Sequence, residues 1–308
     1  MNEYVQAEKN SIIERDSYLT STNIIPINGF NIKWKSLGPY NITRIPNMEN
    51  FYGSGKINAF AIDNSNPNIM YVGAGLQAIG GPFSSAGIYK TINGGKTWFP
   101  VDNGLYDAQI TSIILDQSNI SIIITSTWSN LISKSPMGIF RSDNGGSSWY
   151  PVLNIPTTYL YYDNGTIYAS TTNGIYVSQN WGLNWSLLKA TSTWVTLVKV
   201  LNGNIYTGLW NGTELIYQKN ISKWYYTTPS TLKEPSPWIM DIAVNPWNNY
   251  EQFIVYWRSY QTPDLFYTSD GGENWSVVEN YSGAAQELAY GENGSTIYMG
   301  TDGALYVS

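Results

Sequence analysis

The chain has 308 residues, of which 43% are hydrophobic and 15% aromatic, while only 12% carry a charge. Its net charge is −6, it contains no cysteine and no histidine, and it has no basic run. These values exclude disulfides, cysteine or histidine catalysis and histidine-ligated metals, and they argue against nucleic acid as a partner. No apolar run approaches the length of a membrane span. We expect neither a cofactor nor a metal, because no calcium-loop spacing of acidic residues occurs.

A short phrase that ends in tryptophan recurs along the chain. It combines a hydroxyl residue, a glycine-containing turn and a tryptophan that begins a β-rich segment. One diverged copy lacks the glycines. The copies are YKTINGGKTWFPV (89–101), FRSDNGGSSWYPV (140–152), YVSQNWGLNWSLL (176–188), YQKNISKWYYT (217–227, diverged) and YTSDGGENWSVV (267–278). Their tryptophans are separated by 51, 36, 39 and 51 residues. Such spacing is typical of one four-stranded unit per repeat.

The residues between these turns predict short strands, because β-branched and aromatic residues alternate and are bounded by Gly, Asn, Asp and Pro. In chain order, the predicted strands of the first three units are 57–63, 69–75, 87–91 and 98–101; 110–116, 121–127, 138–142 and 149–153; and 157–163, 166–171, 174–178 and 185–188. Those of the next three units are 195–200, 204–210, 214–218 and 224–228; 239–245, 252–257, 265–269 and 275–279; and 286–291, 296–301 and 304–308.

The sixth unit lacks its tryptophan-bearing fourth strand. Residues 31–38, NIKWKSLG, carry Trp34 and a short strand pattern that would supply it. Pairing this segment with 304–308 would close a ring and leave no unpaired edge strand. The sequence therefore predicts an all-β fold, a six-bladed β-propeller of four-stranded antiparallel blades over residues 31–308. Residues 1–30 are the most charged segment and are expected to form an N-terminal arm.

The repeated phrase resembles the Asp-box (BNR) repeat, S-x-D-x-G-x-T-W, of sialidase-like, sortilin-like and xyloglucanase-like propellers. Asn replaces the acid in three of the four clear copies. The resemblance implies a turn between the third and fourth strands of each blade, and we interpret it as structural, because a catalyst would not recur once per blade. The glycines would adopt positive φ, Asn or Asp would accept turn N–H groups, and the tryptophan would be buried between blades. The structural residues so assigned are Asn93, Trp98, Asn144, Trp149, Asn180, Trp185, Asp270 and Trp275.

Aromatic residues are concentrated in the loops that follow second and fourth strands, which share one face of a propeller. Next to Asn, Gln and Ser they favour sugar binding, since C–H groups stack on rings while hydroxyls take polar partners. The alternative is that they pack the loops onto the ring. The loops contain Tyr40, Phe51, Tyr52, Phe83, Trp128, Trp238, Trp257 and Tyr260, and Trp210 begins another loop. As candidate ligand-binding residues we take Tyr40, Arg44, Tyr52, Phe83, Trp128, Trp210, Trp257, Arg258 and Tyr260.

Sialidases that carry this repeat clamp a substrate carboxylate with three arginines. The chain has four arginines, of which Arg15 lies in the arm and Arg141 is expected on the outer side of a blade. Arg44 and Arg258 remain, and two arginines do not complete the triad. The resemblance therefore argues against sialidase activity.

A glycosidase of another type needs two carboxylates across the scissile bond. Alignment of the first strands places Asp241 and Glu287 at equivalent positions of neighbouring blades, so they are the candidate catalytic pair. The alternative is that each only bonds loop backbone. Asp63, Asp116 and Asp163 are interpreted as turn formers. The acids without a pattern are interpreted as loop residues: Glu49, Asp107, Glu214, Glu234, Asp264 and Asp302.

The chain contains nine Asn-x-Ser/Thr sequons, which favour a glycosylated protein that is extracellular or on a cell surface, although no signal peptide precedes them. The sequon residues are Asn41, Asn119, Asn164, Asn184, Asn211, Asn220, Asn274, Asn280 and Asn293. The sparse charge is compatible with an acidic exterior and an acid-living, archaeal source.

Three functions remain open. The first is a propeller that binds glycans or a glycosylated surface, the second a glycoside hydrolase that uses the carboxylate pair, and the third a structural module of a cell surface or virion. In the third, residues 1–30 would dock a partner. Neither nucleic acid nor insertion into a membrane is expected.

Overall fold

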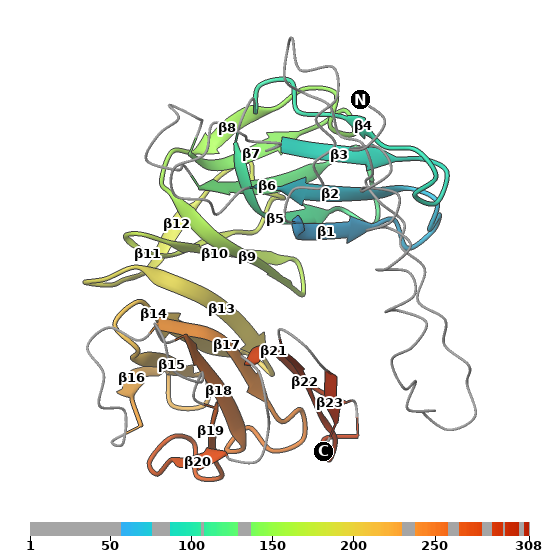
Figure 1. The fold of residues 1–308 in the computed structure, drawn as a ribbon. Helices are drawn as coiled ribbons and strands as arrows, with labels where there is room; N and C mark the ends of the chain where they lie inside the picture. Colours follow the sequence, from blue (N-terminus) through green and yellow to red (C-terminus); the bar gives the residue numbers. More distant parts are fainter. Residues whose placement is uncertain are drawn as a thin grey trace, which may run out of the picture. The chain divides into compact units, whose positions relative to one another are not determined.

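A computed structural model describes residues 57–75, 87–105, 108–128, 137–229, 238–257, 265–278, 285–291, 293–301 and 305–307. The described residues contain strands and turns but no helix, and hence none that could cross a membrane. The described strands form six sheets, five of four strands and a last one of three. Figure 1 shows how these sheets follow one another along the chain.

Each sheet is an antiparallel meander whose strands follow one another in the sequence. The first three blades are β1 Ile57–Ile62, β2 Met70–Ala74, β3 Gly87–Thr91 and β4 Phe99–Pro100; β5 Gln109–Leu115, β6 Ile123–Trp128, β7 Gly138–Ser142 and β8 Tyr150–Leu153; and β9 Thr157–Asp163, β10 Thr166–Thr171, β11 Gly174–Ser178 and β12 Ser186–Ala190. The last three are β13 Val195–Leu201, β14 Asn204–Leu209, β15 Glu214–Gln218 and β16 Lys223–Thr227; β17 Trp238–Val244, β18 Gln252–Trp257, β19 Leu265–Thr268 and β20 Ser276–Val278; and β21 Ala285–Tyr290, β22 Ile297–Thr301 and β23 Leu305–Val307.

The first strands of successive sheets lie against one another, from β1 beside β5 to β17 beside β21. They are therefore the innermost strands of a six-bladed β-propeller, as the repeat predicts. The predicted strand limits agree with the observed ones to within two residues. The arm 1–30 and the proposed closing strand 31–38 fall outside the described residues.

Every innermost strand carries a β-bulge at the same place. The bulged residues are Asn58, Thr111, Thr158, Thr196, Met240 and Gln286. The residue after each bulge therefore marks one equivalent position around the propeller, held by Ala59, Ser112, Tyr159, Leu197, Asp241 and Glu287. Because a bulge re-aims the side chains next to it, this ring of positions can reach the neighbouring blade.

Three bulged side chains do link one blade to the next. The Asn58 amide donates to the carbonyl of Ile110 at 3.2 Å. The Thr111 hydroxyl donates to the carbonyl of Thr157 at 3.1 Å, and the hydroxyl of Thr158 donates to Val195 at 2.7 Å. Each acceptor is the residue just before the bulge of the following blade, so the bonds set the blades in a common register.

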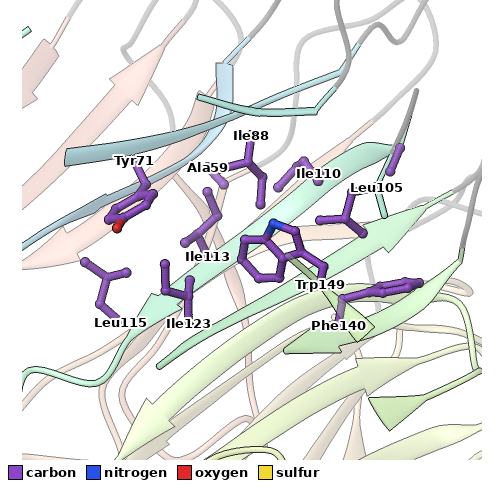
Figure 2. Packing of buried hydrophobic residues seen from close by; sticks show 11 residues of the cluster. Ala59, Tyr71, Ile88, Leu105, Ile110, Ile113, Leu115, Ile123, Phe140 and Trp149 are labelled. Carbon is purple, nitrogen blue, oxygen red and sulfur yellow. The ribbon is translucent and has the colours of Figure 1, made fainter. Parts of the chain in front are cut away.

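Apolar side chains fill the space between neighbouring blades. Figure 2 shows the cluster of the first two blades, in which Tyr71 and Ile88 lie opposite Ile113 and Trp149. Trp149 is buried, and its indole N–H donates to the carbonyl of Val101 in the preceding blade at 2.7 Å. The prediction that this tryptophan is buried between blades is therefore confirmed.

The recurrent turn lies between the third and fourth strands, as predicted, and has the same hydrogen bonds in each of its four clear copies. In the first copy, the Thr91 hydroxyl accepts from Gly95 N–H at 3.0 Å, and Asn93 Oδ1 accepts from Thr97 N–H at 2.9 Å. Ser142 with Asn144, Ser178 with Asn180, and Thr268 with Asp270 repeat this pair of bonds. Asn therefore serves as well as Asp, since only an acceptor oxygen is needed.

Glycine is required in this turn for two reasons that Gly272 illustrates. Its φ is +93°, in the region that side chains with a Cβ rarely adopt. A Cβ there would also approach the Thr227 hydroxyl oxygen to 2.7 Å. The other three tryptophans of the turns, Trp98, Trp185 and Trp275, are partly buried and pack against apolar clusters.

Candidate functional site: a tryptophan row

Five tryptophans from three blades form a continuous row of ring contacts, which we call the tryptophan row: Trp128, Trp194, Trp210, Trp238 and Trp257. Trp128 and Trp194 meet edge to face, with ring centroids 5.1 Å apart and planes at 63°. Trp194 and Trp210 are tilted by 51° at 5.2 Å. The row therefore spans blades two, four and five.

The other half of the row is a parallel stack. Trp210 and Trp238 lie 4.4 Å apart with planes at 13°, and Trp238 and Trp257 lie 4.1 Å apart at 7°. Both faces of Trp238 are therefore covered by neighbouring indoles. Within the described residues, no aromatic ring covers the second face of Trp257.

The register of the strands explains why these residues meet. Trp128, Trp210 and Trp257 all stand one residue beyond the pair that closes the bulge, at the end of the second strand. Trp194 directly precedes β13 and Trp238 is the first residue of β17, so both stand two residues before the bulge of their innermost strand. Trp238 is the cross-strand partner of Trp257, and the backbone N–H of Trp210 donates to the carbonyl of Trp194 at 2.9 Å.

Blade three carries smaller side chains at the same two places. Thr172 N–H donates to the carbonyl of Pro156 at 3.1 Å, which repeats the backbone bond between Trp210 and Trp194. Because no indole fills blade three there, Trp128 can reach Trp194.

The row is open to solvent, since 39% of Trp194, 37% of Trp210 and 38% of Trp257 is exposed. Indole rings bury large apolar area with little loss of rotamer freedom and stack on C–H faces, while the ring N–H can donate to a polar ligand. Among the described residues, the second face of Trp257 is not stacked on another aromatic ring, so it is the part of the row best placed to stack on a ligand.

The structure brings together three of the predicted ligand-binding residues, Trp128, Trp210 and Trp257. It adds Trp238, which was named among the loop aromatics but not among the candidate ligand-binding residues. Trp194 was missed. Its signal is the parallel between STWVTLVKV and SPWIMDIAV, in which tryptophan directly precedes an innermost strand. The remaining predicted residues lie outside the described residues: Tyr40, Arg44, Tyr52, Phe83, Arg258 and Tyr260.

Asp241 and Glu287 do occupy equivalent positions on neighbouring blades. The Asp241 carboxylate, however, is engaged. Its Oδ2 accepts from the backbone N–H of Leu288 at 2.7 Å, and its Oδ1 accepts from Ile242 N–H at 2.8 Å. The Oδ1 also lies 2.5 Å from the ammonium of Lys199 in the preceding blade. Asp241 therefore joins blades four, five and six.

Ser112 has the same role in blade two. Its hydroxyl accepts from the N–H of Leu160, the residue that corresponds to Leu288, at 3.0 Å. A contact of Asp241 thus recurs in a blade without a carboxylate, which favours a structural reading of that contact.

Glu287 is exposed, and its carboxylate lies near Tyr159 of blade three. Burial, together with the negative charges of Asp241, Tyr161 and Glu287, raises the pKa of Tyr159 to about 12. The innermost ring therefore gathers a phenol and two acids. Within the part of the chain that the structure describes, no group of three acidic side chains is placed to hold a metal.

Arg141 lies in the third strand, β7, and is only 4% exposed, because its guanidinium donates to Asp143 at 2.6 Å and to the carbonyl of Trp181 in the next blade. One expectation needs correction. Glu214 is not a loop residue: it begins β15 and is fully buried. Asp63 and Asp116 do form turns, since each accepts a backbone N–H two residues ahead.

Seven of the nine sequons lie in described residues, and each asparagine among them is exposed: Asn119, Asn164, Asn184, Asn211, Asn220, Asn274 and Asn293. Asn41 and Asn280 lie outside. Exposure leaves these side chains accessible to a sugar-transferring enzyme, although the Asn274 amide donates to Asp270 at 2.8 Å.

No protein-family model and no curated protein matches the chain. Among solved structures, it is similar to the GH74 xyloglucanase from Xanthomonas campestris, with a TM-score of 0.61 and 15% identity over 82% of this chain and 44% of that one. It is also similar to YCF48 bound to D1 peptide, with a TM-score of 0.55 and 14% identity over 85% and 80% of the two chains.

A third similar structure is the extracellular domain of a one component system from B. thetaiotaomicron, with a TM-score of 0.58 and 15% identity over 82% of this chain and 32% of that one. The chain spans less than half of the length of the xyloglucanase and of this extracellular domain. At such identities the likeness shows the fold alone. The protein is a six-bladed β-propeller, and the solved structures that share its fold include glycoside hydrolases and an extracellular domain.

Proposed function

We propose that the protein binds carbohydrate, as free glycan or on a glycosylated surface, through the tryptophan row. The observation that supports this most is the half-exposed row itself. Indole rings are usually buried when a protein folds. A solvent-exposed group of aromatic rings of this extent therefore supports a binding site. The second face of Trp257, which no other aromatic ring of the described residues covers, suits stacking on a pyranose ring.

Two further assignments belong to the same proposal. The four turns with identical hydrogen bonds support membership of the Asp-box repeat class, with Asn93, Asn144, Asn180 and Asp270 as the acceptors. The exposed sequons, and the extracellular domain among the similar structures, support a position outside the cell or on its surface.

The test is a titration of the intact protein with xyloglucan oligosaccharides and with a panel of other neutral and acidic glycans. Tryptophan fluorescence and calorimetry would report binding. Trp257→Ala removes the stacking face at Trp257 and should weaken binding by about tenfold or more, which corresponds to about 1.4 kcal/mol. Trp247→Ala is the matched control, because Trp247 is a tryptophan that is 78% exposed and does not belong to the row.

Trp238→Ala provides a second comparison. Both faces of Trp238 are used by the row itself, so its loss should weaken binding only by loosening its neighbours. The proposal fails if no glycan binds the wild type, or if Trp257→Ala and Trp247→Ala bind equally well.

Glycoside hydrolysis is the alternative function, supported by the equivalence of Asp241 and Glu287 on neighbouring blades. In this reading one acid protonates the leaving oxygen while the other acts as base or nucleophile. Mass spectrometry of the same oligosaccharides after incubation at acidic and neutral pH tests it. Cleavage that is abolished in both Asp241→Asn and Glu287→Gln, with binding retained, would establish the hydrolase. Absence of cleavage by the wild type would exclude hydrolysis of these substrates.

A further inference from the structure

Glu214 occupies a core position that is aliphatic in every other blade. It pairs with Gly208, and the residues with the corresponding partner in the other blades are Ile88, Ile139, Ile175, Leu265 and Leu305. The first four of these are buried. A carboxyl group has therefore taken the place of a buried Ile or Leu in blade four alone.

The carboxyl of Glu214 is fully buried, and neither oxygen has a hydrogen-bond partner within the described residues. Among the described residues, the titratable groups close enough to interact with it are phenols: Tyr206 from β14, Tyr225 from β16 and Tyr256 from β18. From β13 and β17, Thr196 and Ile239 face the backbone of Gly208.

Charged side chains on those two strands do not compensate Glu214. Lys199 of β13 forms its ion pair with Asp241 of β17. Among the residues that the structure describes, the acid thus has no cation beside it, and burial raises its pKa to about 8. Unpartnered buried carboxyls of this kind are costly to a fold and are commonly kept for a function.

Glu214 lies at the junction of the segments that hold the tryptophan row. Residues 210–213 form the turn that joins β14 to β15. Trp210 is its first residue, and Glu214 directly follows the turn. The Tyr256 hydroxyl donates to the carbonyl of Gly212 in the turn at 3.0 Å, and Tyr256 directly precedes Trp257. Glu214 therefore lies next to the bond that ties the turn of Trp210 to the strand of Trp257.

We propose that Glu214 is a pH-sensitive group that regulates the tryptophan row. The neutral acid is compatible with the apolar space between blades four and five, where it lets Tyr256 hold the turn. The carboxylate is not, because none of the described residues offers it a cation or an N–H donor, so ionisation draws Glu214 and residues 210–213 toward water. Trp210 then loses its stacked position on Trp238. The consequence for ligand binding, which is strong in acid and weaker in base, rests on the proposed function.

The structural part can be tested without a ligand, since the stacked indoles report on themselves. Near-UV circular dichroism and tryptophan fluorescence of the full chain are followed from pH 5 to 9.5, and far-UV circular dichroism monitors the sheets. We expect one optical transition with a midpoint near pH 8 in the wild type. Glu214→Gln, which removes the charge, and Glu214→Leu, which restores the residue type of the other blades, should both lack it.

The variants retain the α-amino group and all tyrosines, so titration of these groups would persist in them. The inference is overturned if the wild type shows no transition between pH 6 and 9.5, or if the transition remains in both variants. It is also overturned if the far-UV signal collapses with the same midpoint, because the fold as a whole would then be responding. A glycan screen at pH 5 that finds no binding would defeat the proposed function and leave the optical result standing.

Discussion

Asp241 and Leu288 are joined across two neighbouring blades, with the carboxylate Oδ2 2.7 Å from the backbone nitrogen. The same link joins Ser112 to Leu160 at 3.0 Å in blades two and three. The innermost ring therefore uses the position after the bulge to tie each of these blades to the next, and Asp241 adds an ion pair to Lys199.

Removal of this link should destabilise the propeller. Asp241→Ala leaves a buried N–H and a partly buried ammonium without partners, and we expect a loss of about 2–3 kcal/mol in the free energy of unfolding. Asp241→Ser, which has the side chain of the equivalent position in blade two, should lose clearly less. Urea titrations of both variants provide the measurement, and equal losses would contradict the shared role.

Glu214→Leu should stabilise the protein in a pH-dependent manner. The pKa is raised from 4.5 to about 8 in the fold, so below about pH 4.5 both states are protonated and the acid carries no ionisation cost. As the pH rises to 8, the unfolded chain releases its proton while the fold retains it, and stability is lost progressively. The advantage of Glu214→Leu should therefore grow by on the order of 4 kcal/mol between pH 4 and 8. Denaturant titrations at several pH values test this, and a constant difference would contradict it.

Asp270→Asn should preserve the turn, because Asn occupies the same place in three other blades with the same hydrogen bonds. The bonds from Asn274 and Thr268 lower the pKa of Asp270 to about 2. Its contribution is therefore present above about pH 4 and is lost as the pH falls through 2. We expect Tm values of variant and wild type to differ more at pH 6 than at pH 2. A difference that grows toward pH 2 would contradict the assignment.

Trp149→Phe should cost about 1–3 kcal/mol in unfolding free energy, since it leaves the partly buried carbonyl of Val101 without its indole donor and opens space in the cluster that contains Ile113. Trp247→Phe is the control and should change stability by less than about 0.5 kcal/mol, as is usual for exposed positions. Chemical denaturation of the two variants side by side provides the measurement. Equal effects would mean that the tryptophan of the turn does not fasten the blades.

The repeat made much of this fold predictable. A tryptophan after a glycine turn at blade spacing is a local signal, and period-two alternation fixes which residues form strands, so most limits could be placed within two residues. The turn bonds of Asn93 or Asp270 were also predictable, because they join residues four positions apart and depend on nothing outside the turn.

The candidate site was less accessible to sequence reasoning. Loop position identified Trp128, Trp210 and Trp257 singly, but not that they form one row with Trp194 and Trp238. Ring contacts of this kind join residues of three blades, and their geometry follows from the bulge and from the small residues of blade three. The role of Asp241 could not be judged from the sequence either, since its partners in other blades, Lys199 and Leu288, lie more than 40 residues away in opposite directions along the chain.

The sequence by itself determined the class of fold, the number of blades and the chemistry of each turn, because these depend on local periodicity and on a repeat. Only the tertiary structure decided which polar groups are paired and which indoles meet. Glu214 shows the difference most clearly. In the sequence ELIYQ, Glu214 looks like an ordinary acid at the end of a strand. In the fold it replaces a core Ile or Leu, because the register of the sheet, and not sequence spacing, decides what a side chain faces.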